Sequence, residues 1–333
     1  MRVRPLALTL VLMWVAAACS SGDDPGSAAG RPDEPAATTA VPVPTTTVPA
    51  TTTTAEPDPT TATAVVTQGG IVVPVISHAG DGWTVRTPCN ATATLARGRG
   101  RHAGSPVIVL DPGHGGAEPG AVSPSGLVEA GVNLAVSRHT QAALEAEGVT
   151  ALLTRTGDYE VELPFRSELA RNTSPKAFVS IHHNAEPDGP RDGPGAETYY
   201  QIASPDSKRL AGLIYEEVVR AFSQYQVAWV ADRDAGAKYR PSRTGGSDYY
   251  AMLRQPGKVV SVLVEGAFIS NPAEAALLAR PEVQKVEGEA IARGIMRYLT
   301  TKDPGSGFVE PYPRIDAPST PGPPSRRCRD PEL

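Results

Sequence analysis

The sequence has few cysteines, little clustered positive charge and no long apolar segment at its start, and each shortage argues against a class of protein. Its 333 residues contain 3 cysteines and no C-x-x-C pair, too few for a disulfide scaffold or a cysteine-bound structural zinc. The formal net charge is −5, and the basic stretch at 97–102 is short, so we expect no nucleic-acid partner. The apolar stretch at 6–18 is shorter than the roughly 17 residues that cross a bilayer as a helix.

The N-terminus has the pattern of an export signal. Arg2 and Arg4 precede the apolar stretch, and three alanines precede Cys19. This ending resembles the lipobox of bacterial lipoproteins, although Ala16 stands where leucine is usual. We therefore expect residues 1–18 to be removed and Cys19 to carry a lipid, which places the protein outside the cytoplasm, on the outer face of the membrane or in the cell wall. Ordinary cleavage after Ala18, without a lipid, is the alternative.

Low-complexity segments flank a central region. Residues 19–70 are rich in proline and threonine, a composition that predicts a disordered tether, or a simple spacer. Two short β-prone runs around an Ala-Gly-Asp-Gly turn predict a small β-hairpin extension at 71–104. Residues 303–333 form a proline-rich tail.

The two remaining cysteines lie in these flanks. With Cys19 assigned to a lipid, Cys89 and Cys328 form an even pair in an oxidising compartment. A disulfide between them would pin both flanks to the domain. Two independent thiols are the alternative.

Between residues 105 and 302, apolar strands alternate with helical spacing. This order predicts a single α/β domain with a mixed, largely parallel sheet and helices on both faces. The expected strands are 107–110, 149–153, 177–181, 196–200 and 259–264, and the expected helices are 130–147, 163–172, 208–222, 272–279 and 281–299.

Chemically useful side chains follow three of these strands. His114, His182 and Glu265 each lie at a strand end, and Glu129 begins the first helix. Two histidines and one carboxylate leave a fourth position on a zinc ion open for water, and the second carboxylate can take the proton of that water. Each residue also has an ordinary structural explanation. His114 would suit a glycine-rich turn, Glu129 would suit a helix N-terminus, and His182 would suit a packed core. Glu265 is the exception, because a carboxylate at the end of an apolar strand is costly unless it is paired or has a function.

The motifs DPGHGG, FVSIHHNA and VLVEGAFISNPAEA, in this order, resemble those of the zinc-dependent N-acetylmuramoyl-L-alanine amidases of the type 3 family, over residues 106–300. The resemblance, to a cell-wall lipoprotein of actinobacterial type, implies one Zn²⁺ per chain held by His114, Glu129 and His182. It also implies that Glu265 activates the water and protonates the leaving amine, and that Asn184 orients the substrate or supports the site.

The sequence departs from the family at two places. His183 stands where a small residue is usual, and a shift by one residue in a strand would turn the side chain to the other face. We keep His182 as the ligand, because it matches the family pattern. Ala267-Phe268 follow Gly266 where a Thr-Gly-Phe-like context is common. Regulated members carry a long helical insertion after the SIHxN strand, but 185–195 is too short for one, so we expect no plugged resting state. We expect 227–246 to be a solvated loop, with a mobile hairpin at the cleft edge as the alternative.

The function implied is hydrolysis of the amide between N-acetylmuramic acid and L-Ala of the peptidoglycan stem peptide, by a monomer that meets the membrane only through its lipid. A zinc peptidase that cuts within the stem peptide and a non-catalytic wall-binding lipoprotein are the alternatives.

Overall fold

The computed structural model describes residues 61–243, 245–313 and 328–333. The expected signal peptide, Cys19 and most of the expected tether lie outside the described residues. None of the described helices is both long enough and apolar enough to cross a membrane.

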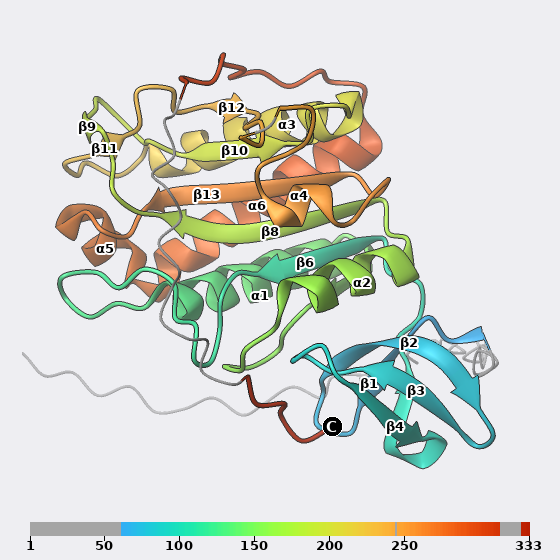
Figure 1. Ribbon diagram of the computed structural model, residues 1–333. Coiled ribbons are helices and arrows are strands. Elements are labelled where there is room, and N and C mark those ends of the chain that lie inside the picture. Colours follow the sequence, from blue (N-terminus) through green and yellow to red (C-terminus); the bar gives the residue numbers. More distant parts are fainter. Residues whose placement is uncertain (1–60, 244, 314–327) are drawn as a thin grey trace, which may run out of the picture. The chain divides into compact units, whose positions relative to one another are not determined.

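The central sheet is mixed and largely parallel, as the sequence predicts (Figure 1). Its strand order is β12-β10-β13-β8-β6-β7. The last four are parallel to one another, whereas β10 runs antiparallel to β13 and parallel to β12. The bounds are β6 Ile108–Pro112, β7 Ala151–Leu153, β8 Ala177–Asn184, β10 Glu197–Tyr200, β12 Ala237–Lys238 and β13 Ser261–Phe268.

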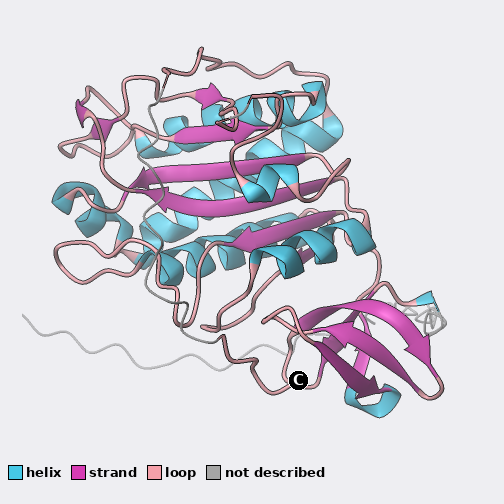
Figure 2. Cartoon of the chain, in the orientation of Figure 1, coloured by secondary structure: helices cyan, strands magenta, loops and turns pink. Residues whose placement is uncertain are grey.

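Helices cover both faces of this sheet, again as predicted (Figure 2). Three long helices pack together on one face, α6 lying against α1 and α3. The second face carries α2 and the short α4, which contact each other. The bounds are α1 Glu129–Ala146, α2 Leu163–Thr173, α3 Pro205–Phe222, α4 Ala251–Arg254, α5 Pro272–Leu278 and α6 Pro281–Thr300.

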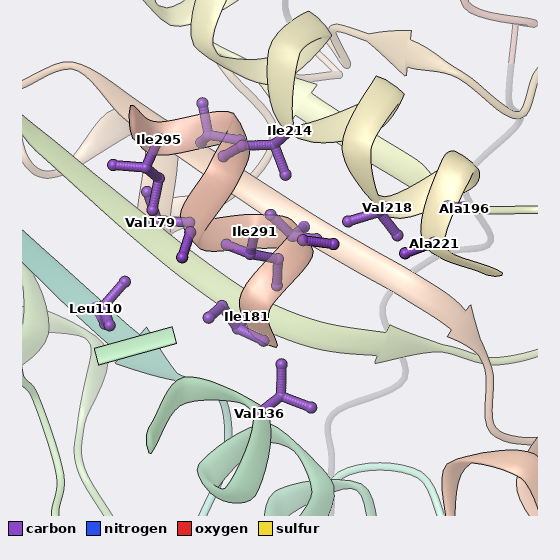
Figure 3. Packing of buried hydrophobic residues seen from close by; sticks show 14 of the residues in the cluster. Leu110, Val136, Val179, Ile181, Ala196, Ile214, Val218, Ala221, Ile291 and Ile295 are labelled. Atoms are coloured by element: carbon purple, nitrogen blue, oxygen red, sulfur yellow. The ribbon is translucent and has the colours of Figure 1, made fainter. Parts of the chain in front are cut away.

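The alternation of side chains along β8 explains how one strand serves both faces. Val179 and Ile181 join the core cluster that includes Val136 of α1 and Ile291 of α6 (Figure 3). Phe178 joins the cluster on the other face, which includes Met252 of α4. Along β8, odd-numbered residues therefore face α1 and α6, and even-numbered residues face α2 and α4.

The N-terminal extension is larger than the sequence predicted. It is a five-stranded antiparallel sheet in the order β4-β3-β2-β1-β5, not a hairpin. Strand β1 lies within the segment expected to be a tether, and its Val65 is fully buried. The sequence analysis missed this strand because β1 follows a threonine-rich segment. Only its pairing with β2 and β5 distinguishes β1 from that segment. The bounds are β1 Ala64–Thr67, β2 Val72–Ala79, β3 Gly82–Arg86, β4 Thr92–Ala96 and β5 Gly100–His102.

The end of the chain returns to this small sheet. A disulfide joins Cys89 to Cys328, with a Cα–Cα distance of 5.5 Å. Next to it, the Asp330 carboxylate accepts hydrogen bonds from the Thr87 hydroxyl at 2.8 Å and the Cys89 backbone N–H at 2.7 Å. The C-terminal residues are thus bound to the N-terminal extension by covalent and polar contacts.

Candidate metal centre

The sheet register places His182 and Glu265 side by side. Strands β8 and β13 are parallel, and Glu265 pairs directly with His182. Paired residues on neighbouring strands present their side chains to the same face. Leu263, two residues before Glu265, packs in a cluster with Leu253 of α4, so this is the α2/α4 face of the sheet.

The Glu129 carboxylate lies between the two histidines. Its Oε1 atom is 3.1 Å from His114 Nε2 and 3.1 Å from His182 Nδ1. The two imidazole rings meet edge to face, with centroids 4.7 Å apart. One donor atom from each of the three residues lies within 4.8 Å of the others. Two imidazole nitrogens and one carboxylate oxygen form a donor set that Zn²⁺ prefers, so the residues present fit this ion.

The electrostatics of this cluster favour a cation. Burial alone would lower the pKa of His114, but hydrogen bonds and charge interactions with Glu118 and Glu129 raise it to about 9. For the carboxyl group of Glu129, burial acts in the opposite direction and would raise the pKa, yet His114 and His182 hold this pKa well below its usual value. The carboxylates therefore stabilise positive charge at the position where the three donors converge.

The turn that carries His114 requires an unusual backbone. His114 has a positive φ of 61°, a backbone conformation that residues other than glycine rarely adopt. At Gly113, a Cβ atom would lie 2.1 Å from the His182 ring, so only glycine fits there. Two buried arginines hold the turn. Arg166 donates to the His114 carbonyl at 2.9 Å, and Arg155 donates to the Gly113 carbonyl at 2.9 Å.

Glu129 is more than a helix N-terminal acid, because its carboxylate is fixed from several sides. The Ala121 backbone N–H donates to Oε2 at 2.8 Å. The Asn133 side-chain amide and the His183 backbone N–H each donate to Oε1 at 3.2 Å. These donors hold Oε1 toward the two histidine rings.

Glu265 is a partly buried residue whose carboxyl group has an unusual environment. Its Oε2 atom is buried and has no hydrogen-bond partner within the described residues. Burial, followed by repulsion from Glu129 and Glu197, raises its pKa well above the usual value. A carboxylate with high proton affinity beside a metal site can accept a proton from water and return it to a leaving group.

The structure also separates the two adjacent histidines of β8. His182 lies on the α2/α4 face with Glu129 and Glu265, whereas His183 points to the opposite face and its side chain has 0% exposure. There the Nε2 atom of His183 is 3.1 Å from Glu287 Oε2 of α6.

A polar network missed by the sequence analysis supports Asn184. The Asn184 amide donates to Glu197 Oε2 at 3.1 Å, and the Tyr199 hydroxyl donates to the same oxygen at 2.6 Å. The buried Lys238 ammonium donates to Glu197 Oε1 at 2.6 Å and to Asp234 Oδ1 at 2.7 Å. The Glu197 and Asp234 carboxylates thus already surround the Lys238 ammonium. The sequence analysis missed this contact because no local pattern pairs Glu197 with a lysine 41 positions later.

Asp234 and Lys238 of this network lie in the segment 227–246, and the expected solvated loop is wrong for the middle part of that segment. Trp229, Ala237 and Lys238 are buried, with exposures of 6%, 0% and 1%. Strand β11 (Val230–Ala231) pairs with β9 (Gly189–Pro190). Between β8 and β10 the chain forms no helix, and every residue of that connection is described.

Open space lies at the metal donors and, separately, beside Asn184. A cavity of about 550 Å³ is lined by His114 and His182 together with Leu163 of α2 and Met252 of α4. A second cavity of about 610 Å³ begins at Asn184. The donor set is therefore accessible to an extended substrate.

Comparisons with known proteins agree with this architecture. The family model for N-acetylmuramoyl-L-alanine amidase (Amidase_3) matches residues 108–297. The chain is 33% identical over 233 residues to N-acetylmuramoyl-L-alanine amidase AmiC of Neisseria meningitidis, covering 61% of this chain and 55% of that protein. It is 33% identical over 213 residues to the uncharacterized protein YqiI of Bacillus subtilis, covering 63% of this chain and 90% of that protein. The chain thus spans about half the length of AmiC and most of YqiI.

Two solved structures from Clostridium difficile share the fold. Cwp6 matches with a TM-score of 0.52 and 30% identity, covering 60% of this chain and 30% of Cwp6. An N-acetylmuramoyl-L-alanine amidase from strain 630 matches with a TM-score of 0.50 and 28% identity, covering 60% of this chain and 100% of that one.

Proposed function

The chain belongs to the N-acetylmuramoyl-L-alanine amidase family Amidase_3, and on this premise we propose that it hydrolyses the amide between N-acetylmuramic acid and L-Ala of the peptidoglycan stem peptide. The observation that carries the proposal is the convergence of His114, Glu129 and His182, with Glu265 paired beside His182 on the same face. This arrangement matches the requirement for three metal ligands and one separate proton carrier in a hydrolytic zinc site.

His114 Nε2, His182 Nδ1 and the Glu129 carboxylate would hold one Zn²⁺ per chain. When bound, the ion would supply Lewis-acid polarisation of the amide carbonyl and would lower the pKa of a water molecule to about 7. The negative potential that the Glu118 and Glu129 carboxylates create at this point favours a bound cation and supports the assignment.

Glu265 is the proposed general base and acid. Its carboxylate takes a proton from the attacking water and hands it to the amide nitrogen of L-Ala, which leaves as an amine. The raised proton affinity of Glu265 and its unpartnered Oε2 atom suit both transfers. Asn184, held by Glu197, lies at the edge of the second cavity and would orient the substrate there.

The cellular placement is proposed from the sequence. We infer that residues 1–18 direct export and that Cys19 carries a lipid, so that a tether holds the catalytic domain near its wall substrate. A monomer is sufficient for this reaction, since all four chemical groups come from one chain.

The experiment is to digest purified peptidoglycan with the chain beginning at residue 19, with Cys19→Ser to prevent lipid attachment, and to analyse the products by mass spectrometry. We expect stem peptides with a free amine on L-Ala and one zinc per chain. Bound zinc with cuts elsewhere in the stem peptide would assign a peptidase instead. A Glu265→Gln chain serves as the control for contaminating hydrolases.

A further inference from the structure

The side chains of His183 and Glu287 form a fully buried polar pair behind the metal centre. Both side chains have 0% exposure, and His183 Nε2 is 3.1 Å from Glu287 Oε2. The other ring nitrogen, Nδ1, is 2.7 Å from Asn133 Oδ1. An amide oxygen only accepts hydrogen bonds, so Nδ1 of His183 donates to Asn133 Oδ1, while Nε2 faces the Glu287 carboxyl group.

Asn133 connects this pair to Glu129. Its side-chain nitrogen donates to Glu129 Oε1 at 3.2 Å and to the Gly113 carbonyl at 3.3 Å. Rotating the amide by half a turn would face its oxygen toward these two acceptors and its nitrogen toward a ring donor. The donor on His183 therefore fixes the orientation of the Asn133 amide, and the amide fixes the Glu129 carboxylate.

The same pair also contacts the strand that carries Glu265. Gly266 follows Glu265 in β13, and a Cβ atom at Gly266 would lie 2.0 Å from Glu287 Oε1. That oxygen is buried and has no hydrogen-bond partner within the described residues. A buried polar pair with an unsatisfied oxygen is expensive, and well-packed apolar side chains usually serve stability as well or better. Stability alone does not explain its presence here.

We propose that Asn133, His183 and Glu287 form a positioning network that holds the Glu129 carboxylate from the face of β8 opposite the metal centre. The network rests on the proposed function, because its purpose is to preorganise a zinc ligand. Partners of this kind, one step behind a metal ligand, typically contribute about 10- to 100-fold to metal affinity or activity.

The test is the double variant His183→Met/Glu287→Met, which removes both polar side chains together and so leaves neither one buried without its partner. We expect a thermal midpoint close to that of the wild type. We also expect zinc affinity, measured by competition with a chromophoric chelator, to fall by about 10- to 100-fold. The matched control is Thr173→Val, which removes a buried hydrogen bond to the Leu169 carbonyl at 2.7 Å. It should change the thermal midpoint but leave zinc affinity unchanged.

A second variant follows the connection through Asn133. Asn133→Ala should weaken zinc binding in the wild type but add little in the double-variant background, because the amide is no longer oriented there. Unchanged zinc affinity in the double variant, or effects that simply multiply when Asn133→Ala is added, would overturn the network alone. A wild-type chain that binds no zinc would overturn the network and the proposed function together, whereas zinc binding without amidase products would overturn only the latter.

Discussion

Replacing Arg166 by methionine tests how the His114 turn is supported. The Arg166 guanidinium is buried, lies 2.7 Å from Asp111 Oδ1, and donates to the carbonyls of Pro112 at 2.7 Å and His114 at 2.9 Å. Breaking a buried ion pair by removing one partner costs about 3–5 kcal/mol, because the other charge is left unpaired. We expect Arg166→Met to lower the free energy of unfolding by that amount.

The assay is urea unfolding followed by circular dichroism, with zinc held at a fixed concentration. A double variant, Asp111→Asn/Arg166→Met, leaves no unpaired charge and should recover part of the loss. It should not recover zinc affinity, since the His114 turn still lacks its donor. A loss below about 1 kcal/mol in Arg166→Met, the range of an exposed pair, would refute this reasoning.

Three further predictions concern the reaction, the disulfide and acid stability. Glu265→Gln should keep its zinc and lose activity by about 10²- to 10⁴-fold, measured as amine release from muropeptides; substantial remaining activity would contradict its role as general base. Cys89→Ser/Cys328→Ser should lower the free energy of unfolding by about 2–5 kcal/mol in urea titrations, with wild-type chain under reducing conditions as the comparison. Burial would raise the pKa of Asp111, but Arg166, Ser180 and Thr154 together hold it below the usual value. Its contribution to stability is therefore present above an unfolded-state pKa of about 3.9 and is lost as the pH falls through the folded-state pKa, an acid loss that Asp111→Asn should reduce.

Local patterns predicted five strands of the central sheet, because each of them is a short apolar or β-prone run, but they missed β12 (Ala237–Lys238), which lies in the expected loop. The run before Asp111 and the run before His182 needed no knowledge of their neighbours to be identified as strands. The amphipathic spacing of α3 is equally local. Strand β1 failed this test, because Ala64–Thr67 follows a threonine-rich stretch and becomes a strand only by pairing with β2 and β5.

The metal donors could be found from the sequence because each follows a strand or begins a helix at one edge of the sheet. The supporting residues could not be found in this way. Lys238 and Glu197 are brought together by pairing between strands, and Glu287 reaches His183 from a helix 104 positions later. Charged residues in amphipathic helices normally face solvent, so nothing in the sequence around Glu287 distinguishes it from an exposed glutamate.

The disulfide between Cys89 and Cys328 encloses the whole α/β domain within one covalent ring of the chain. A single proteolytic cut at any exposed loop inside that ring opens the ring without releasing a fragment. The two pieces would stay linked, and they would separate on a denaturing gel only after reduction. With the export proposed above, the chain would therefore remain one molecule after a single cut by an extracellular protease.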